Sequence, residues 1–415
     1  MKRAPGHDVS IEPKASTSQQ TLRGLDWLNF LLADVQSGVG PFLAIYLAGY
    51  RWNEESVGLA LTVGGIAGIL TQTPAGGLVD YLRSKRALVG VAVAALAAGA
   101  LLIALFPSFW PVMGAQVLIG GTSSVFLPAI CAMSLGIVGR AAFDVRQGSN
   151  QTFNSAGNVV AAVSMGLLGY FVSNRSIFFF VAAFAAPTIL VLLMIRPAEI
   201  DYELARGATD GGKSKVESVW VLFRDRPLVL FLVCAVMFHF ANAAMLPLLG
   251  EMLAKGRGRS SMLFMSACVI TTQVVVTLLA SWSGRKAGVW GRKPLMLIAF
   301  GILPLRAVLY TLTANTALLV AIQVMDDIAA AIFGVVSVLV IADLTRGTGR
   351  FNLTLGAINT AVGIGAALSQ VIAGTIVHHM GFNAGFLFLA AVAVAAFAIL
   401  YLFMPETHNT RLEIA

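Results

Sequence analysis

The amino-acid sequence predicts an all-α integral membrane protein with twelve transmembrane helices in two pseudo-symmetric six-helix bundles. Of its 415 residues, 58% are hydrophobic and only 12% are charged, whereas soluble domains have roughly 50% apolar and about 25% charged residues. Because a helix needs about 20 apolar residues to cross the hydrocarbon core, about twelve spans account for the apolar runs. A short basic segment recurs 208 residues later, again between apolar runs, which indicates a duplicated chain.

The distribution of positive charge supports this topology. With twelve spans and both termini on the inner side, 22 of the 28 Lys and Arg residues fall inside, as the positive-inside rule requires. We therefore expect a multi-pass protein of a cell inner (plasma) membrane with both termini cytoplasmic, and a net charge of +8 that sets orientation rather than binding nucleic acid. Arg306 falls within a span, and the bases that fall outside are Arg51, Arg175, Lys255, Arg257 and Arg259.

The first half begins with a polar cytoplasmic tail, residues 1–24, which has no apolar stretch that would form a signal peptide. The N-terminal bundle covers residues 25–195. Basic residues after Val79, a turn at Pro107 and a polar segment at 139–150, predicted to be an inner loop, separate its apolar runs. The helices predicted from these runs cover residues 27–47, 56–79, 87–106, 109–138, 151 onward and 177–195.

A charged segment that contains two adjacent glycines, residues 196–226, is predicted to be a cytoplasmic linker. The C-terminal bundle covers residues 227–404, and a polar cytoplasmic tail, residues 405–415, follows it. We expect the three cysteines, which lie in apolar runs, to pack in the core rather than to bind metal or form disulfides. The predicted helices cover residues 227–250, 261–283, 294–313, 316–342, 353–377 and 384–404.

Short matches between the halves support the duplication. At offsets of 208 and 207 residues they pair 30–34 with 238–242, Gln116 with Gln323, and Phe126 with Phe333. Many secondary transporters consist of two such halves, with the substrate site between them near the bilayer midplane.

The two basic segments share a motif. The first copy keeps Gly76, Asp80, Lys85 and Arg86, and has Arg83 where a second glycine belongs. The second copy keeps Gly284, Gly291, Arg292 and Lys293, and has Gly288 where the acid belongs. This pattern resembles the loop between helices 2 and 3 of the major facilitator superfamily. Over residues 25–405 the chain resembles the twelve-helix members of that family, and in character it is closest to drug/proton antiporter-like exporters.

The resemblance implies that the motif acts in a gate. Asp80 would tie the two halves together near the start of the helix at 353–377, whose free N–H groups favour a carboxylate, and the bases of the motif would pair with acids on the inner face. Because Gly288 replaces the acid in the second copy, we expect the inner closure to depend mainly on the Asp80 side.

Ionisable side chains inside the spans are candidates for function, since each costs several kcal/mol unless it is paired or hydrated. Asp34 is the only carboxylate within the predicted spans of the first half, and by the resemblance its helix lines the central cavity, so it is a candidate for proton coupling. Asp326 and Asp327 lie at a depth similar to that of Arg306. Because adjacent helical residues point about 100° apart, we expect one acid to form a buried ion pair with Arg306 and the other to face the cavity. Both acids are also candidates for proton coupling.

Polar and aromatic side chains of the cavity-lining helices are candidates for substrate contact. His239 and Asn242 share one helix face, and His239 can titrate near neutral pH, although a packing role for this histidine is the alternative. The other candidates are Gln36, Gln116, Gln323, Phe42, Phe126 and Phe333.

Together these features predict a secondary transporter that works by alternating access, with proton-coupled export of a small amphiphilic compound as the leading interpretation. The alternatives are uptake of a small organic solute, metal efflux, and a membrane sensor that does not transport. The expected partners are the substrate, protons and the lipid bilayer, without nucleic acid, cofactor or bound metal, and we expect a functional monomer. The sequence contains no nucleotide-binding loop, metalloprotease motif or nucleophile elbow, so we expect no enzyme.

Overall fold

The structure is a computed structural model in which all regular secondary structure of the described residues is helical. It describes residues 17–37, 43, 46–47, 49–50, 52, 54–207, 224–249, 252 and 260–408. The helices of the first half are α1 (Gln19–Ser37), α3 (Glu54–Tyr81), α4 (Lys85–Leu105), α5 (Phe109–Phe171) and α6 (Asn174–Met194). Two short 3₁₀ helices follow, η1 (Pro197–Glu199) and η2 (Leu204–Arg206). Those of the second half are α8 (Arg226–Ala243), α10 (Ser260–Trp290), α11 (Arg292–Leu312), α12 (Thr316–Leu344), α13 (Phe351–Met380) and α14 (Phe382–Phe403).

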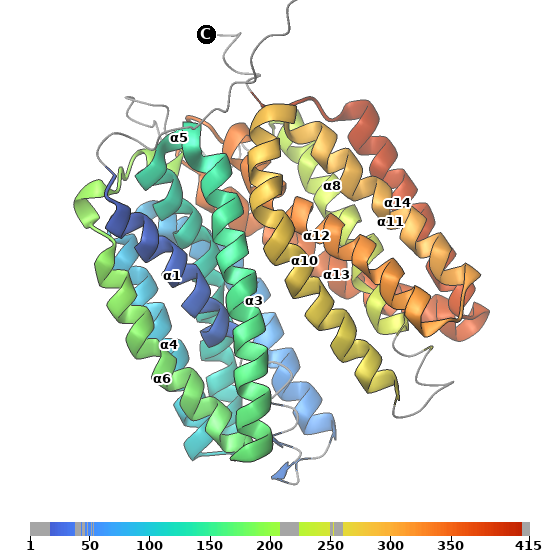
Figure 1. The fold of residues 1–415 in the computed structure, drawn as a ribbon, viewed down its shortest axis with the longest axis horizontal. Coiled ribbons are helices and arrows are strands. Elements are labelled where there is room, and N and C mark those ends of the chain that lie inside the picture. The colour runs from blue at the N-terminus through green and yellow to red at the C-terminus, as the bar shows by residue number, and fades with distance from the viewer. Residues whose placement is uncertain are drawn as a thin grey trace, which may run out of the picture.

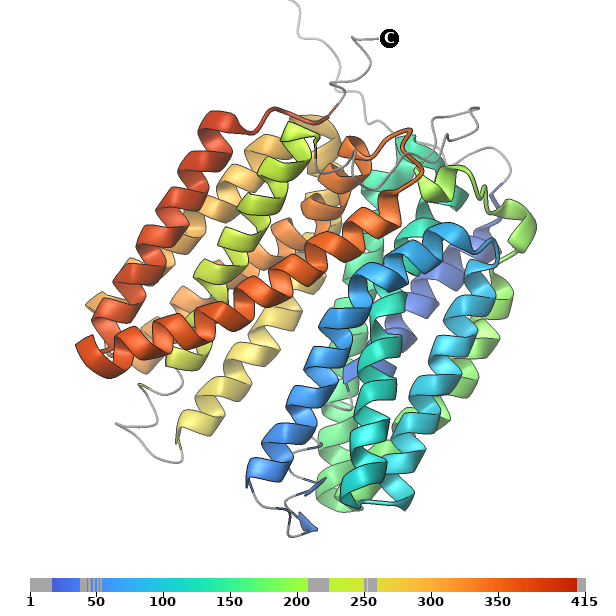
Figure 2. The same cartoon turned by 180° about the vertical axis from the view of Figure 1, so that it is seen from behind.

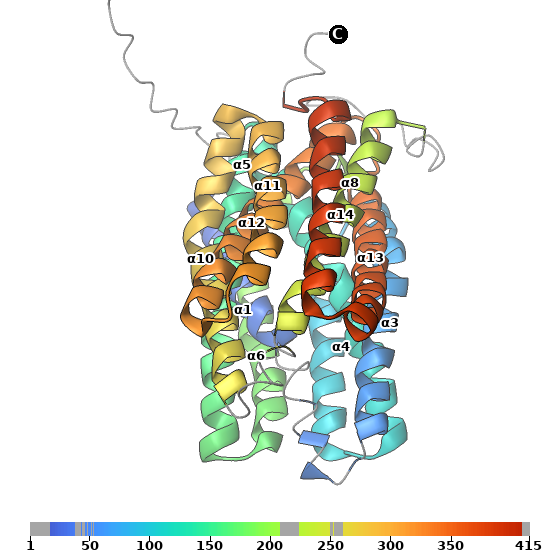
Figure 3. The ribbon, with the colours of Figure 1, turned by 90° about the vertical axis from the view of Figure 1, so that its right-hand side faces the viewer.

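The helices form two groups that correspond to the two halves of the sequence (Figure 1). Two helix pairs join the groups: α3 lies beside α13, and α5 lies beside α10 (Figures 1 and 2). Within the second group, α10, α11 and α12 lie on one side and α8, α13 and α14 on the other (Figure 3). We call the end of the bundle that contains η1, η2 and the turn between α3 and α4 the linker end.

In the part of the chain that the structure describes, eight helical segments are long and apolar enough to cross a membrane by length and composition. Most helix boundaries lie within about three residues of the predicted ones; α11, for example, is Arg292–Leu312 against a prediction of 294–313. The first helix is an exception, because it begins at Gln19 instead of residue 27. Its start is anchored to η1, where Glu199 accepts hydrogen bonds from the backbone N–H and the hydroxyl of Ser18, at 3.1 and 3.0 Å. The predicted tail of residues 1–24 therefore ends earlier than expected.

The prediction of an inner loop at residues 139–150 is wrong. The element α5 (Phe109–Phe171) consists of two helical parts that meet at Gly139, the one residue in it that leaves helical geometry, with φ 75° and ψ 172°. A left-handed φ of this kind suits glycine, which has no Cβ to clash with its own backbone. The chain thus turns within a single residue, and the next residue already starts the second helical part of α5.

Four glycines allow the close approach of the two joining helix pairs. A Cβ on Gly76 would collide with the carbonyl oxygen of Asn352, and one on Gly356 with that of Gln72. In the other pair, a Cβ on Gly284 would collide with the carbonyl oxygen of Asp144, and one on Gly148 would lie 2.8 Å from that of Ala280. Gly76 and Gly284 are 208 residues apart, and so are Gly148 and Gly356. The two contacts, which we call the α3–α13 seam and the α5–α10 seam, are therefore related by the internal repeat.

Candidate functional site

The α3–α13 seam is closed at the linker end by a buried carboxylate. Asp80 is 4% exposed at the end of α3. One of its oxygens accepts a hydrogen bond from the backbone N–H of Leu353 at 2.8 Å, and the other accepts from the side-chain amide of Asn352, also at 2.8 Å. The same amide donates to the carbonyl of Ala205 at 3.0 Å, which adds the segment after α6 to the contact. The predicted contact between Asp80 and the start of the eleventh helix is present.

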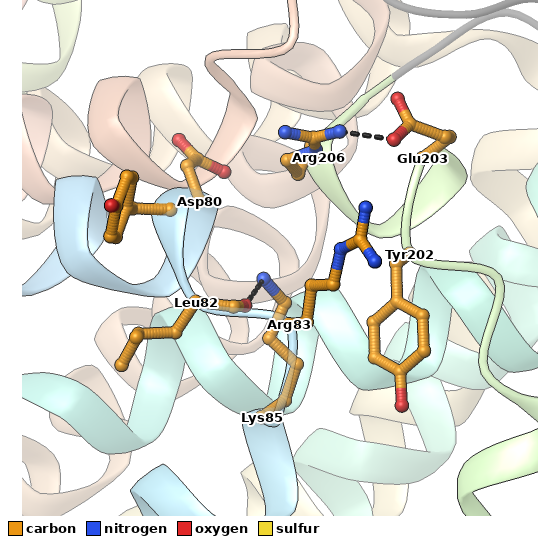
Figure 4. A pocket seen from close by; sticks show the side chains of 8 residues that line it. Asp80, Leu82, Arg83, Lys85, Tyr202, Glu203 and Arg206 are labelled. Atoms are coloured by element: carbon orange, nitrogen blue, oxygen red, sulfur yellow. Dashed lines mark hydrogen bonds and ion pairs between the residues drawn. The ribbon is translucent and has the colours of Figure 1, made fainter.

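The bases that follow Asp80 differ from expectation, because among the described residues they form no ion pair with an acid of the inner face. Lys85 is buried, and its ammonium group donates to the carbonyl oxygens of Leu82, at 2.6 Å, and Val79. Figure 4 shows Arg83 between Tyr202 and the ion pair of Arg206 with Glu203. Lys85 therefore stabilises the turn between α3 and α4.

The α5–α10 seam is closed by an arginine at the start of α11. The guanidinium group of Arg292 donates two hydrogen bonds to Asp144 of α5, at 2.6 and 2.9 Å, and a third to Asp343 of α12 at 2.9 Å. Bidentate arginine–carboxylate pairs of this kind are strong and directional. The Glu406 carboxylate accepts from the backbone N–H groups of Arg292 and Lys293, at 2.8 and 3.0 Å, so the chain after α14 caps α11.

The prediction that the closure depends mainly on the Asp80 side stays a prediction, but the second seam also has a carboxylate of its own. A Cβ on Gly288 would lie 3.2 Å from a carboxylate oxygen of Asp144, so the missing side chain makes room for this acid. Asp144 is 208 residues before Asn352, the residue that receives Asp80 in the first seam. In the second seam the acid therefore lies on the facing helix.

A buried polar ring lies inside the second bundle between α11 and α12. Arg306, which is 0% exposed, forms an ion pair with Asp326. Asp326 accepts a hydrogen bond from the amide of Gln323 at 3.0 Å, and the Gln323 oxygen accepts from the Tyr310 hydroxyl at 2.6 Å. The Arg306 guanidinium lies 5.5 Å from the centre of the Tyr310 aromatic ring, so the contacts among these four side chains form a closed ring. The predicted ion pair is confirmed, and Asp326 is the acid that forms it.

The expectation that the other acid faces a cavity is wrong. Asp327 is 0% exposed and accepts a hydrogen bond from the Thr272 hydroxyl of α10 at 2.6 Å. Its second oxygen is buried and has no hydrogen-bond partner among the described residues. Next to the ring, the His239 side chain packs edge-on against Phe333, with ring centres 4.9 Å apart. Arg306, Asp326 and Asp327, which we call the buried cluster, therefore lie beside aromatic side chains.

A second buried network, which the sequence did not predict, joins α1 to α5. Asp26 forms an ion pair with Arg146, and Arg146 donates to the Asn150 oxygen at 2.8 Å. The Asn150 amide donates to Ser134 at 2.8 Å, and Asn29 donates to the same Asn150 oxygen at 3.2 Å. The earlier start of α1 brings Asp26 into the bundle, so Asp34 is not its only carboxylate. The sequence signal that could have identified this network is the presence of an acid, Asp26, and a base, Arg146, in two helices that face each other.

Several predicted cavity residues are buried against neighbouring helices in this structure. Gln116 is 5% exposed and donates to the Ala60 carbonyl of α3 at 3.1 Å, so it holds two helices together rather than lining an open space. Phe126 is 1% exposed. Asn242 is partly buried on α8. The side chains of Asp34 and Gln36 and the whole of Phe42 lie outside the described part of the structure.

The chain matches known proteins over nearly its whole length. The family model of the major facilitator superfamily matches residues 27–303 and 277–414. The chain belongs to the major facilitator superfamily. Two proteins of Mycobacterium tuberculosis, from strains CDC 1551 / Oshkosh and ATCC 25618 / H37Rv, are each 43% identical to it over 413 residues, which are 99% of this chain and 97% of theirs. Both have the name uncharacterized MFS-type transporter.

Membership of this superfamily makes the protein a multi-pass membrane transporter rather than an enzyme. The two seams lie at the predicted motif and at its repeat, and the motif residues Gly76, Asp80, Gly284 and Arg292 all contribute to them. Among the described residues, no group of three or more His, Cys, Asp and Glu side chains is placed to hold a metal ion.

Proposed function

We propose that this transporter exports a small amphiphilic compound in exchange for protons by alternating access. The observation that carries the proposal is the charge of the buried cluster formed by Arg306, Asp326 and Asp327. With both acids ionised, one guanidinium faces two carboxylates and the cluster has a formal charge of −1. Uptake of one proton neutralises the cluster. This uptake is favourable because an unbalanced charge inside a membrane costs several kcal/mol.

The surroundings of the cluster suit an amphiphilic substrate. Phe333 stacks on Phe238 with ring centres 4.3 Å apart, and Phe300 lies 4.8 Å from Phe238. These rings are buried in this structure, and in a form with separated bundles they would offer apolar contact beside charge to the same molecule. We propose that the substrate contacts these rings and His239, and that its binding and proton binding to the cluster influence each other.

The test uses purified protein in liposomes with an imposed pH gradient and a panel of amphiphilic fluorescent dyes. We expect dye movement against the proton flow by the parent protein. Asp327→Asn makes the cluster neutral without removing the partner of Arg306, so it should abolish gradient-driven movement but retain dye–dye exchange. A matched control, Asp225→Asn at the start of α8, should retain both. Coupled transport by Asp327→Asn would refute the role of the cluster, and proton flow in the same direction as the solute would indicate uptake.

In the first bundle, Asp34 remains our candidate for proton coupling. It is one turn from the position that aligns with His239 under the repeat, and it aligns with Asn242. Asp34→Asn should lose gradient-driven transport while the protein remains folded. Undiminished coupled transport by this variant would show that the proton pathway lies in the second bundle alone.

We also propose that the linker end faces the cytoplasm of a cell whose inner membrane holds the protein as a monomer. The bases of both motif copies lie at this end, in agreement with the positive-inside rule. An alkaline phosphatase fusion after Ala415 should be inactive and a fluorescent-protein fusion bright. The opposite result would invert the topology. The mass of the protein in a native mass spectrum tests the monomer.

A further inference from the structure

A groove lies at the linker end between α4 and α6, outside the two seams. It has a volume of about 280 Å³. Its lining changes along α4 from polar to apolar, with Ser84 and Arg86 at the start of the helix and Gly90 one turn further. Leu192 and Leu193 of α6 line the apolar part. The groove is therefore amphipathic along its length.

The polar end of the groove carries positive charge that no acid among the described residues neutralises. Arg83 and Arg86 form no ion pair or hydrogen bond with any other residue in the described ranges, and the Nε atom of Arg86 is buried without a partner. Nearby acids are already engaged, since Asp80 bonds α13 and Glu203 pairs with Arg206 (Figure 4). A buried donor without a partner is unfavourable, and an anionic ligand would satisfy it.

A neighbouring cavity extends the polar end. Tyr202 lines both the groove and a cavity of about 70 Å³, which Arg83 and Arg206 also line. A charged group seated between Arg83 and Arg86 would therefore have room beside Tyr202. The charged lining of this cavity is Arg83, Lys85 and Arg206 together with Asp80 and Glu203, and both acids already have partners.

The apolar end of the groove continues onto the outer surface of the bundle. Leu193 is 62% exposed and Val91 of α4 is 67% exposed, and both lie in helices apolar enough to cross the membrane. Side chains of this kind face acyl chains in a bilayer. A free anion would occupy only the polar end of such a groove, whereas a lipid would fill both ends.

We propose that this groove binds an anionic phospholipid, with its phosphate between Arg83 and Arg86 and an acyl chain over Gly90 and Leu192. Basic pockets between transmembrane helices on the side where positive loops gather are sites for anionic headgroups. The site belongs to the first bundle alone, so it does not depend on the proposed transport reaction.

The test titrates the purified full-length protein, in neutral detergent, with phosphatidylglycerol and with phosphatidylcholine, and counts bound lipid by native mass spectrometry. The parent should bind one phosphatidylglycerol in preference to phosphatidylcholine. Arg83→Ala combined with Arg86→Ala should weaken this binding roughly 30-fold, from the usual contribution of two basic side chains near an anionic lipid surface. The matched control is Arg285→Ala with Lys286→Ala, which removes the same charge from the last turns of α10 in the second half and should leave binding unchanged.

A third variant separates a lipid from a free anion. A Cβ on Gly90 would lie 3.5 Å from the nearest atom of Leu192, an ordinary contact, so Gly90→Leu should fold and fill the groove. This variant should lose phosphatidylglycerol although both arginines remain. Displacement of the lipid by inorganic phosphate at equal concentration, or binding unaffected by Gly90→Leu, would overturn the lipid assignment. An equal loss in the two double variants would show unspecific attraction by net charge and would also overturn it.

Discussion

The clearest test of the seams is to neutralise Asp144, the acid that the motif does not predict. In Asp144→Asn, the two hydrogen bonds from the Arg292 guanidinium to a carboxylate of α5 become at most one bond to a neutral amide oxygen. Arg292 keeps Asp343, which belongs to its own bundle. The substitution therefore weakens a contact between the two bundles while leaving each bundle internally intact.

The size of the effect follows from the bonds that are lost. Hydrogen bonds to charged groups contribute about 1.5–3 kcal/mol, against about 1 kcal/mol for neutral ones. Arg292 is 4% exposed, so water replaces little of the lost interaction, while the remaining attraction of Asp343 moderates the loss. We expect the form closed at the linker end to lose about 2 kcal/mol relative to an open form, which changes their ratio about 30-fold.

Spin-label distances across the linker end measure this ratio. Labels at Tyr81→Cys and Val289→Cys, which are 82% and 75% exposed in opposite bundles, would report the separation in a background with the native cysteines replaced by alanine. Asp144→Asn should add a population at longer distance. Asp343→Asn is the matched control, since its contact with Arg292 lies within one bundle and remains in the open form, so this substitution should not increase the population at longer distance.

A compensating substitution sharpens the test. Combining Gly288→Asp with Asp144→Asn gives the second seam the arrangement of the first, where an acid on one helix faces an asparagine on the other. This double variant should restore part of the short-distance population. Unchanged distances in Asp144→Asn, or an equal shift in Asp343→Asn, would refute the assignment of Asp144 as a closing contact.

Three further predictions concern the first seam and the buried ring. Asp80→Asn should favour the open form about tenfold, equivalent to about 1.4 kcal/mol, and an unchanged thiol-labelling rate at the linker ends of α5 and α12 would contradict this. Arg306→Ala should destabilise the protein by on the order of 3–5 kcal/mol, and adding Asp326→Ala should recover part of that loss; a thermally stable single variant would show that Arg306 is not needed in the ring. Gly356→Val should keep the linker end from closing, because its side chain would meet the backbone at Gln72, and a short-distance population equal to that of the parent would contradict the close approach.

Helix order and most boundaries followed from the sequence because each apolar run between polar segments has the length of one span. The same reasoning wrongly predicted a loop at residues 139–150, and the cause is physical. Its polar side chains Arg146 and Asn150 resemble those of a loop, but they are buried and find partners in Asp26 and Ser134. A polar face inside a membrane bundle has the composition of a loop whenever its partners lie on another helix.

The ion pair of the second bundle was predictable only in part. Arg306 and the two acids were identified because they lie at a similar depth on adjacent helices. Since adjacent residues of a helix point about 100° apart, Asp326 and Asp327 were expected to have different partners. Which acid faces Arg306 depends on the rotation of α12, and this rotation is set by its packing against α10, where Thr272 meets Asp327. Sequence spacing alone contains no information on that rotation.

The positions of the two closing acids explain how the seams can open in the proposed cycle. Asp80 and Asp144 both belong to the first bundle, and their donors, Asn352 with Leu353 and Arg292, belong to the second. Separation of the bundles would expose two carboxylates, which water solvates well, whereas a buried arginine without a partner would be costly. Arg292 avoids that cost because Asp343 moves with it. The motif therefore marks where the halves meet, and the second acid on the Arg292 side is what makes the contact reversible.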